Sequence, residues 1–571
     1  MDLAQLFLIP KNTTHRQYEA LRAYFVEQLP APEVARRFGY TRGSLHQLIH
    51  QFRRDPDRLF FLEPPRPGAK RNDLLRQRII QLRKQNLSIY DISEALKKED
   101  IRRTPVAVAA ILQEEGFAKL PRREDAERPA VIKPTAGIRT DVRALNLDPR
   151  NFRTKFGGLF LFLPALIELG FDRVIGRCAL PGTQMLPAAH AVRSLLALKL
   201  FGSQRHLHVM SAVLDEGLAL FAGLNVIPKR SFLTEYSSRL NPSSFPKLMR
   251  HWFDAMTGIG LKHGSSFDLD FHTIPFHGED ALIEKHYVSK RSRRQKGILA
   301  FLVHDAQTRF FCYANSDLRK DAQNDEILAF VKFWKKRTGK LPEELIFDSK
   351  LTTYGNLHRL NRQGIQFITL RRRTPKLMND LLARPTSAWR RIELDSVSRL
   401  YKRPRILDET VRLADYNGLI RQISVADLGH EQPTLLLTNQ LRRSPAKLIE
   451  RYARRMLIEN NIEDGVNFFH IDALSSAVAL KVNCDLQLTL MASSLYRHLG
   501  QRIGNGYETV KSRHLFRDFI DASASIEIDP QNVCVQFQKR AHNPLLTAAG
   551  FDRTDIGIPW LGNRRLRLQF G

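Results

Sequence analysis

The segment that decides the fold of the larger part of the chain is ELIFDSKLTTYGNLHRLNRQGIQFITLRRR, residues 344–373. It gives a short apolar run that ends in an Asp, where the chain turns into KLTTYGNL, and then a second apolar run, IQFITLRRR, so two strands are expected. Three further β-type runs precede it, at 265–276, 297–305 and 308–315, and an amphipathic helix is predicted at 325–337. The order strand, strand, strand, helix, strand indicates an α/β sheet.

Outside this sheet the chain has helical and linker-like regions. Residues 150–262 carry apolar side chains at helical spacing, so we expect a helical domain there. Two small helical units are predicted at 1–62 and 72–125, and the Pro-rich, charged stretch 126–149 is expected to be a linker. Residues 501–571 are expected to form a C-terminal basic region. The chain is therefore expected to be multi-domain, as its 571 residues also require.

The first small unit has the pattern of a helix–turn–helix. PAPEVARRFGYTRGSLHQLIHQFRRDP, residues 30–56, gives a helix, a turn at Gly39 and Tyr40, and a second helix whose N-cap is Thr41. The second helix of such a unit enters the major groove of DNA. The side chains that could reach base edges or phosphates there are Arg42, Ser44, His46 and Gln47. His46 and His50 could also suggest a metal site, but no third ligand is near in the sequence.

A second unit of the same kind is expected from three N-terminal helix signals. Ser88 and Thr104 stand where N-caps belong, and Pro105 suits a first helical turn. A plain three-helix bundle that binds protein is the alternative interpretation of either unit. Lys and Arg total 89 against 59 Asp and Glu, a net charge of +30, and this excess favours double-stranded DNA as the partner. Two tandem units on such a chain therefore predict DNA binding.

The same composition argues against secreted and membrane classes of protein. The four cysteines stand far apart and form no CxxC pair, which argues against a cysteine-ligated zinc site and a disulfide scaffold. The first residues lack the pattern of a signal peptide. Leu159–Leu169 is the most apolar stretch, but it is too short to span a bilayer and is expected to be a buried helix. We therefore expect a cytoplasmic, nucleoid-associated protein with no membrane partner.

Three carboxylates are candidate ligands for a metal ion. Asp270 lies inside the first apolar strand, and Asp348 ends the apolar run of 344–348. Glu459 lies in a helix predicted from near Pro445 past Ile458. Hard divalent cations prefer oxygen ligands, and a pair of them stabilises both the attacking and the leaving oxygen of a phosphoryl transfer. Three acids on a basic chain therefore suggest Mg²⁺, or Mn²⁺, in two copies beside a scissile phosphate.

Three blocks around these acids resemble those of DDE-type bacterial insertion-sequence transposases. The blocks are FDLDFHTIPFHGE at 267–279, LIFDSKLTTYGNLHRLNRQGIQFITL at 345–370 and TLLLTNQLRRSPAKLIERYARRMLIE at 434–459. The third block is similar to the family's signature Tyr-x2-Arg-x3-Glu, here Tyr452, Arg455 and Glu459. The resemblance implies that Asp270, Asp348 and Glu459 are the catalytic, metal-binding acids and that Tyr452 and Arg455 hold DNA phosphates.

The resemblance also implies a fold. It predicts a ribonuclease-H-like catalytic core at 264–374 and 441–500, interrupted by a β-rich insertion at 375–440. The strand order by itself is consistent with that core but would also suit other α/β folds. Family members commonly work as homodimers on paired element ends, so a homodimer is expected in the active complex.

Several assignments within these blocks stay open. The first block offers Asp268 as well as Asp270, and Asp270 better matches the family's spacing to the Pro-x-His-Gly tail. Glu463 lies one turn after Glu459 on the same helical face. Val466 stands where the family usually has a Lys, for which Lys481 is a possible substitute. The basic residues expected to line a DNA channel are Lys290, Arg291, Arg293, Arg294 and Arg371–Arg373, and His272 and His277 are alternative metal ligands.

These observations predict a transposase. It is expected to bind terminal inverted repeats and to catalyse metal-dependent strand cleavage and strand transfer by a cut-and-paste route. One alternative is a non-catalytic DNA-binding regulator derived from a transposase, which the Val466 departure supports. Another is a site-specific nuclease that does not join strands, because it would use the same acids.

Overall fold

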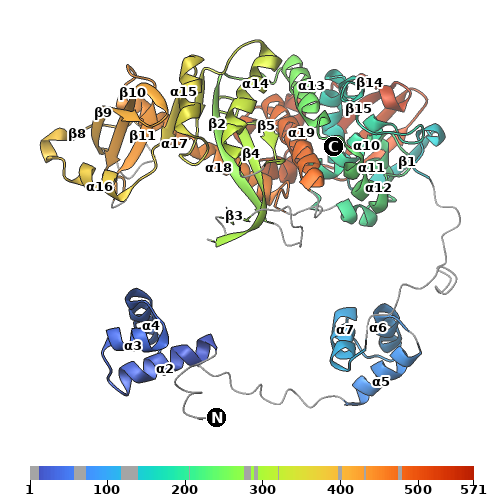
Figure 1. Ribbon diagram of the computed structural model, residues 1–571. Coiled ribbons are helices and arrows are strands. Elements are labelled where there is room, and N and C mark those ends of the chain that lie inside the picture. Colours follow the sequence, from blue (N-terminus) through green and yellow to red (C-terminus); the bar gives the residue numbers. More distant parts are fainter. Residues whose placement is uncertain are drawn as a thin grey trace. The chain divides into compact units, whose positions relative to one another are not determined.

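The computed structural model describes residues 12–56, 73–85, 87–117, 139–204, 206–275, 285–288, 293–318, 321–395, 402–429, 432–472 and 479–571. The chain divides into two compact units, Met1–Thr135 and Ala136–Gly571. The described part of the first unit is entirely helical, whereas the second combines helices with two sheets (Figure 1). None of the described helices combines the length and the apolar character that crossing a membrane requires.

The first unit opens with a group of three helices around one small core. The helices are α2 (Thr13–Phe25), α3 (Ala31–Phe38) and α4 (Arg42–Arg54). Gly39 ends α3 with φ 68°, a left-handed conformation that costs glycine little, and this lets the chain turn at once into α4. The predicted N-cap Thr41 is confirmed: its hydroxyl accepts from the amide of Ser44 in a capping box. The buried side chains from all three helices are Leu21, Val34, Phe38, Leu45 and Ile49, among others.

A second group of three helices has its own core. It contains α5 (Asp73–Lys84), α6 (Ile89–Lys98) and α7 (Pro105–Glu114). The N-caps predicted at Ser88 and Thr104 are both confirmed. Leu75, Ile79, Ile92, Leu96, Val108 and Leu112 pack together inside this group. Because each group buries its own apolar faces, each has the make-up of a small independent module.

The second unit begins with a helical region on a continuous core. Its described elements are β1 (Arg150–Thr154), α8 (Leu163–Glu168), α9 (Phe171–Gly176), α10 (Ala188–Leu200), α11 (Glu216–Ala222), α12 (Arg230–Tyr236) and α13 (Ser244–Gly258). The apolar stretch Leu159–Leu169 is largely buried, as expected, but a 3-10 turn at Gly157–Phe162 leads into α8 instead of one continuous helix. The long helix α19 (Ala479–Ile503) packs against α10 and α13 in the same core.

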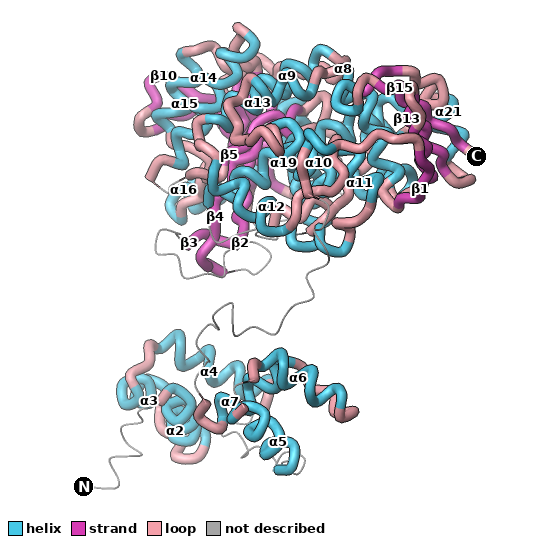
Figure 2. Tube along the Cα trace, turned by 90° about the vertical axis from the view of Figure 1, so that its right-hand side faces the viewer, coloured by secondary structure: helices cyan, strands magenta, loops and turns pink. Residues whose placement is uncertain are grey.

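The C-terminal residues close this region with a sheet of their own. Residues 501–571, expected only as a basic region, contain β12 (Ala524–Ile528), β13 (Asn532–Phe537), β14 (Ile556–Ile558) and β15 (Arg564–Phe570). They form a five-stranded sheet in the order β1-β12-β13-β15-β14. Strand β1 pairs with β12 across Arg150 and Ile528, so the start and the end of the second unit lie side by side (Figure 2). The expectation of a merely basic tail is therefore incomplete.

The large sheet carries the predicted α/β pattern. Its strands β2 (Ser266–Pro275), β4 (Arg293–Asp305), β5 (Phe311–Asn315), β6 (Glu344–Ile346) and β7 (Gln366–Leu370) lie in the order β5-β4-β2-β6-β7. The pairs β5·β4 and β4·β2 are antiparallel, whereas β2·β6 and β6·β7 are parallel. Helix α14 (Glu326–Thr338) connects β5 to β6, and α15 (Tyr354–Arg362) connects β6 to β7. A short strand β3 (Lys285–Val288) pairs with β4.

The segment expected as a β-rich insertion extends this same sheet. It contains α16 (Pro375–Leu382), β8 (Arg390–Arg391), β9 (Arg405–Leu413), β10 (Tyr416–Ala426) and β11 (Thr434–Thr438). Strand β11 pairs antiparallel with β7, so the order continues β7-β11-β10-β9-β8. The insertion is therefore joined to the core by backbone hydrogen bonds between β11 and β7, and its strands β8 to β11 lie together in Figure 1.

The helix predicted from Pro445 is interrupted once. Helix α17 (Pro445–Arg454) ends and α18 (Met456–Asn467) begins on either side of Arg455, whose φ and ψ of −55° and −26° keep the two helices nearly continuous. Leu448 and Ile449 of α17 pack on the sheet against Ile346 and Ile368. Helix α18 contacts β2.

Candidate active site

The register of two neighbouring parallel strands brings two of the predicted acids to the same level of the sheet. Asp268 of β2 is paired with Ile346 of β6. Continuing that register by two residues places Asp270 level with Asp348, at the end of β6 where the chain leaves the sheet. Carboxyl ends of parallel strands are the usual place for ligand-binding groups in α/β sheets.

Arg455 connects the first of these acids with the third. Its Nη2 lies 3.2 Å from Oδ1 of Asp270, and its Nη1 lies 3.6 Å from Oε1 of Glu459. The Arg455 side chain is 9% exposed, whereas Glu459 is 57% exposed. The guanidinium therefore lies between two carboxylates, from β2 and from α18, at the point where α17 passes into α18.

The pKa shifts indicate that the three acids share one electrostatic environment. Burial raises the pKa of Asp270; Arg455 opposes this rise, and the negative charges of Glu459 and Asp348 add to it. The pKa of Arg455 is raised although burial opposes the rise, because Asp270, Asp348 and Glu459 all favour its charged form. Burial also raises the pKa of the Tyr452 phenol, and the same three carboxylates contribute. Asp270, Asp348 and Glu459 are thus a cluster of like charges compensated by one arginine.

A second arginine, one helical turn before Arg455, supports the same strand. Arg451 Nη2 lies 2.8 Å from Asp268 Oδ1, and its Nε lies 2.8 Å from Oε2 of Glu344. Burial raises the pKa of Glu344, but Arg451 and hydrogen bonds from Ser266 and Gln440 outweigh it, so the pKa is lowered overall. Arg451 and Arg455 on the helix thus face Asp268 and Asp270 on the strand as two successive ion pairs.

The open choice between Asp268 and Asp270 is informed by these contacts. The Asp268 side chain is only 2% exposed and also lies 3.6 Å from Nδ1 of His304. Asp270 is 21% exposed and lies with Arg455 in the acid cluster. Asp268 therefore has the environment of a buried structural ion pair, whereas Asp270 has that of a ligand.

The choice between Glu459 and Glu463 is informed in the same way. Glu463 lies 2.6 Å from Nζ of Lys511, in the chain that follows α19. Glu459 carries one of the negative charges that raise the pKa of Asp270, and its Oε1 lies 3.6 Å from Nη1 of Arg455. The geometry therefore favours Glu459 as the member of the acid cluster.

The donor chemistry of the cluster fits a divalent metal ion. Asp270, Asp348 and Glu459 offer carboxylate oxygens, and their mutual repulsion calls for a cation. In this structure Arg455 supplies that positive charge. Within the described ranges no three His, Cys, Asp or Glu side chains are grouped closely enough to hold a metal ion. The same residues would therefore hold a metal only after Arg455 and the side chains around it rearrange.

Histidines beside the cluster have other partners or lie outside the structure's described residues. His272 Nε2 lies 2.6 Å from Oδ1 of Asp472, so this ring is held by a carboxylate beyond α18. His277, Lys290 and Arg291 lie outside the described residues. Arg293 and Arg294 begin β4, but their side chains are likewise outside the described part.

The predicted DNA-contacting side chains of the first unit are on one exposed helix. Arg42, His46 and Gln47 are exposed on α4. The Ser44 hydroxyl is exposed too, but it donates to the carbonyl of Thr41 and accepts from the Thr41 amide. Ser44 therefore acts as a helix cap in this structure, which leaves Arg42, His46 and Gln47 as the better candidates for base or phosphate contacts.

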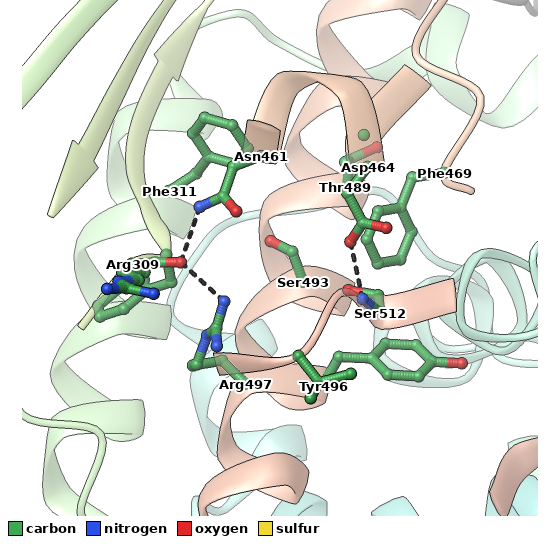
Figure 3. Close-up of a pocket in the computed structure, with 13 residues that line it drawn as sticks. Arg309, Phe311, Asn461, Asp464, Phe469, Thr489, Ser493, Tyr496, Arg497 and Ser512 are labelled. Atoms are coloured by element: carbon green, nitrogen blue, oxygen red, sulfur yellow. Dashed lines mark hydrogen bonds between the residues drawn. The ribbon is translucent and has the colours of Figure 1, made fainter. Parts of the chain in front are cut away.

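Beside α18 lies a small cavity of about 20 Å³ that is lined in part by polar side chains (Figure 3). Asn461 donates to the carbonyl of Arg309 at 2.8 Å, and Arg497 of α19 donates to the same carbonyl at 3.1 Å. The amide of Ser512 donates to Asp464 at 2.8 Å. Burial lowers the pKa of Arg497 to about 10. These hydrogen bonds tie α18, the helix that carries Glu459, to neighbouring parts of the chain.

The departure at Val466 has a structural explanation. Val466 lies near the end of α18, half-buried and packed against the main hydrophobic core. Lys481, the possible substitute, lies in the first turn of α19. Lys511 is a further cation near this helix, through its contact with Glu463.

Sequence reasoning missed Arg451. The signal was available, because Arg451 and Arg455 are four apart on a helix while Asp268 and Asp270 alternate on a strand. Only the docking of α17 on β2 shows that these two spacings match.

Comparison with known families adds to this geometry. Residues 262–495 match the family model of the transposase DDE domain, a span that begins just before β2 and includes all three acids. No curated protein matches the chain. DDE transposases act on DNA and generally use divalent metal ions. The match at residues 262–495 supports a DDE-type insertion-sequence transposase.

Proposed function

We propose that this transposase binds the terminal inverted repeats of a mobile element and cleaves and joins DNA strands in a metal-dependent, cut-and-paste reaction. The observation that carries the proposal is the cluster of Asp270, Asp348 and Glu459 around Arg455. The strand order β5-β4-β2-β6-β7 supports a ribonuclease-H-like core for these acids.

The three carboxylates have the chemistry to hold Mg²⁺ or Mn²⁺, in two copies. Bound there, the ions would supply positive charge that stabilises the attacking and leaving oxygens of a phosphodiester. Asp270 and Asp348 approach from the sheet and Glu459 from α18, so the ligands come from two sides of one site. Burial and the neighbouring acids raise the pKa of Asp270, and a bound cation would favour its charged form against both.

Arg455 and Tyr452 are proposed to bind a DNA phosphate. Arg455 neutralises the acids here, and a phosphate beside the site is the anion to which its guanidinium can turn when a metal replaces it. The Tyr452 ring lies beside the same guanidinium, 6.0 Å from it. We propose that both side chains hold the phosphate that is to be cut.

Recognition of the element ends is assigned to the first unit. Helix α4 offers Arg42, His46 and Gln47 on an exposed face, with Ser44 at its cap. The basic residues Lys290, Arg291, Arg293 and Arg294 follow β3 in the sequence, and we propose that they contact the DNA backbone. A homodimer on paired ends is the proposed active assembly.

A cleavage and binding assay tests this function. Asp270→Asn and Asp348→Asn should each abolish cleavage of an element end and strand transfer in Mg²⁺, while end binding persists. Cleavage at near-parental rate in either variant would overturn the assignment. Parental protein that binds ends but never cleaves would favour the derived regulator, and cleavage without joining would favour a nuclease.

A further inference from the structure

A strongly basic pocket lies at the ends of β6 and β7. It is open, has a volume of about 620 Å³, and contains four cationic side chains. Lys350 comes from the turn after β6, and Arg371, Arg372 and Arg373 follow β7 directly. Its other polar lining residues include Gln323, Ser349 and Thr434, and no acidic residue is among the lining residues that the structure describes. We refer to these four cations and their lining as the basic pocket.

The four cations are unusual in lacking acidic partners. Across the ranges that the structure describes, none of Lys350, Arg371, Arg372 and Arg373 forms a salt bridge. Neighbouring arginines are neutralised instead: Arg405 pairs with Asp427 at 2.7 Å, and Arg421 pairs with Asp408 at 2.9 Å. Uncompensated positive charge is therefore concentrated in one concave place, which attracts an anion.

One of the cations is held in place by the insertion. Arg371 Nη1 donates to Oε1 of Gln422 at 2.6 Å. Gln422 is fully buried in β10, and its amide donates in turn to Glu409 at 3.2 Å and to Ser424 at 3.3 Å. Since those acceptors fix which end of the Gln422 amide faces Arg371, the guanidinium is oriented before any ligand arrives.

The basic pocket adjoins the acid cluster along the chain. Its lining residues Ser349 and Lys350 directly follow Asp348, and the Ser349 amide donates to Asp348 at 2.6 Å. Arg372 Nε in turn donates to the Ser349 carbonyl at 3.4 Å. An anion in the pocket would therefore lie next to the edge of the sheet that carries Asp270 and Asp348.

We propose that the basic pocket binds a backbone phosphodiester of the DNA strand that passes the acid cluster, away from the scissile phosphate itself. This inference rests on the proposed function and adds a second phosphate contact to it. Planar guanidinium groups match the geometry of phosphate oxygens, and Lys350 adds a mobile point charge. The insertion thereby acquires a role: Gln422 of β10 sets the position of Arg371.

Binding measurements on the full-length chain test the proposal. The substrate is an element-end duplex, and the background is Asp348→Asn, so that cleavage does not disturb the equilibrium. The first variant combines Lys350→Ala and Arg372→Ala, both exposed residues whose loss leaves the core intact. The second is Arg371→Ala. The matched control is Arg403→Ala. Arg403 lies in the insertion, outside the basic pocket, and its side chain is 72% exposed and pairs with Glu393.

The expected result has two parts. The affinity of each pocket variant should fall about tenfold or more, and the slope of log affinity against log salt should shrink by about 1 for each lost contact. A series of duplexes, each with one neutral methylphosphonate at a different position, locates the phosphate that is contacted. At one position near the cleavage site, the methylphosphonate should weaken DNA binding by the parent but should not change DNA binding by Arg371→Ala. Arg403→Ala should behave as the parent in both measurements.

Two outcomes would overturn the proposal. One is an unchanged salt slope and an unchanged methylphosphonate profile in the pocket variants. The other is loss of inorganic phosphate or nucleotide binding without any change in DNA binding, which would make the pocket a small-anion site. Failure of the proposed function is seen separately, as a protein with Asp348 intact that does not cleave the element end.

Discussion

Asp268 and Asp270 show how strongly position decides the role of a side chain. They stand two residues apart on one strand and face the same helix, yet the Asp268 side chain is 2% exposed and that of Asp270 is 21% exposed. Asp268 is enclosed by Arg451 and His304. Asp270 shares its surroundings with other acids, which raises the cost of its charge. We therefore expect the two asparagine variants to fail in different ways.

Asp268→Asn should lower stability, because it leaves Arg451, whose side chain is 11% exposed, with Glu344 as its remaining carboxylate partner. Breaking a buried pair costs about 3 kcal/mol. Asp270→Asn should abolish cleavage and leave stability at pH 7 unchanged or raised. The sign follows from the raised pKa of Asp270. The neutral carboxyl group favours the folded state at low pH, and this contribution to the free energy of unfolding is lost as pH rises through the folded-state pKa. At pH 7 the charged carboxylate therefore lowers stability. Thermal unfolding and cleavage of both variants test this, and the reverse pattern would exchange the roles.

Glu459 and Glu463 form a second pair of competing acids. Glu459→Gln should keep the fold and DNA binding but lose cleavage, because an amide is a poor ligand for a divalent ion. Glu463→Gln breaks the contact with Lys511 and should slow cleavage about tenfold at most. Single-turnover cleavage of an element end ranks the two, and the opposite ranking would move the catalytic role to Glu463.

At the scale of elements, the junction of α17 with the sheet depends on Glu344. This carboxylate of β6 lies 2.7 Å from Nη1 of Arg443 and 2.8 Å from Nε of Arg451, and it also accepts from Ser266 at 2.7 Å. It therefore ties the chain around α17 to β6, the strand that leads to Asp348. A single side chain thus holds two of the elements that form the site.

Glu344→Gln should destabilise the second unit by on the order of 3 kcal/mol at pH 7. Because the folded-state pKa of Glu344 is lowered, its contribution is present above the ordinary value of 4.5 and is lost as pH falls through the lower folded pKa. The difference between parent and variant should therefore shrink in acid. Urea unfolding at pH 7 and near pH 3 measures it, with Glu343→Gln, at the exposed neighbouring position, as control. A pH-independent difference would contradict this role.

Elements defined by local signals were predictable, and those defined by distant pairing were not. Thr41, Ser88 and Thr104 cap helices because a hydroxyl satisfies amides three residues away, which a sequence displays directly. The pairing of β1 with β12 joins Arg150 to Ile528, and no local pattern reveals it. The interruption at Arg455 is likewise tertiary, since helix spacing continues through it.

The candidate site likewise contains residues that the sequence indicates and residues that only the folded structure shows. Asp270 and Asp348 could be proposed because charge inside or at the end of an apolar strand is visible in sequence. Arg451 could not, because its partners lie on β2 and β6. The hydrogen bond from Arg371 to Gln422 forms because β11 and β10 join the sheet beside β7. The sequence indicates a β-rich insertion but does not indicate that its strands join this sheet.

At the scale of the whole molecule, the chain divides near Thr135 into two compact units. The first unit is made of two three-helix groups with separate cores, and the second contains both sheets and the acid cluster. Each unit buries its own apolar side chains, so each should fold without the other. Reading of sequence by the first unit and chemistry by the second can therefore be tested by cutting the chain between them.

The chain lacking residues 1–138 should retain the fold of the second unit and bind DNA, but without preference for element ends. Base contacts carry specificity, and a specific binder prefers its site by ~10³-fold or more, whereas phosphate contacts persist on any sequence and weaken steeply with salt. The preference should therefore collapse towards unity while binding stays salt-sensitive. In the full-length chain, replacing both Arg42 and Gln47 by Ala should reduce the preference without unfolding α4, since both are exposed. Competition between an element-end duplex and random DNA measures both effects, with circular dichroism as the check on folding. If the shortened chain still selects element ends, recognition belongs to the second unit and the helix–turn–helix assignment is wrong.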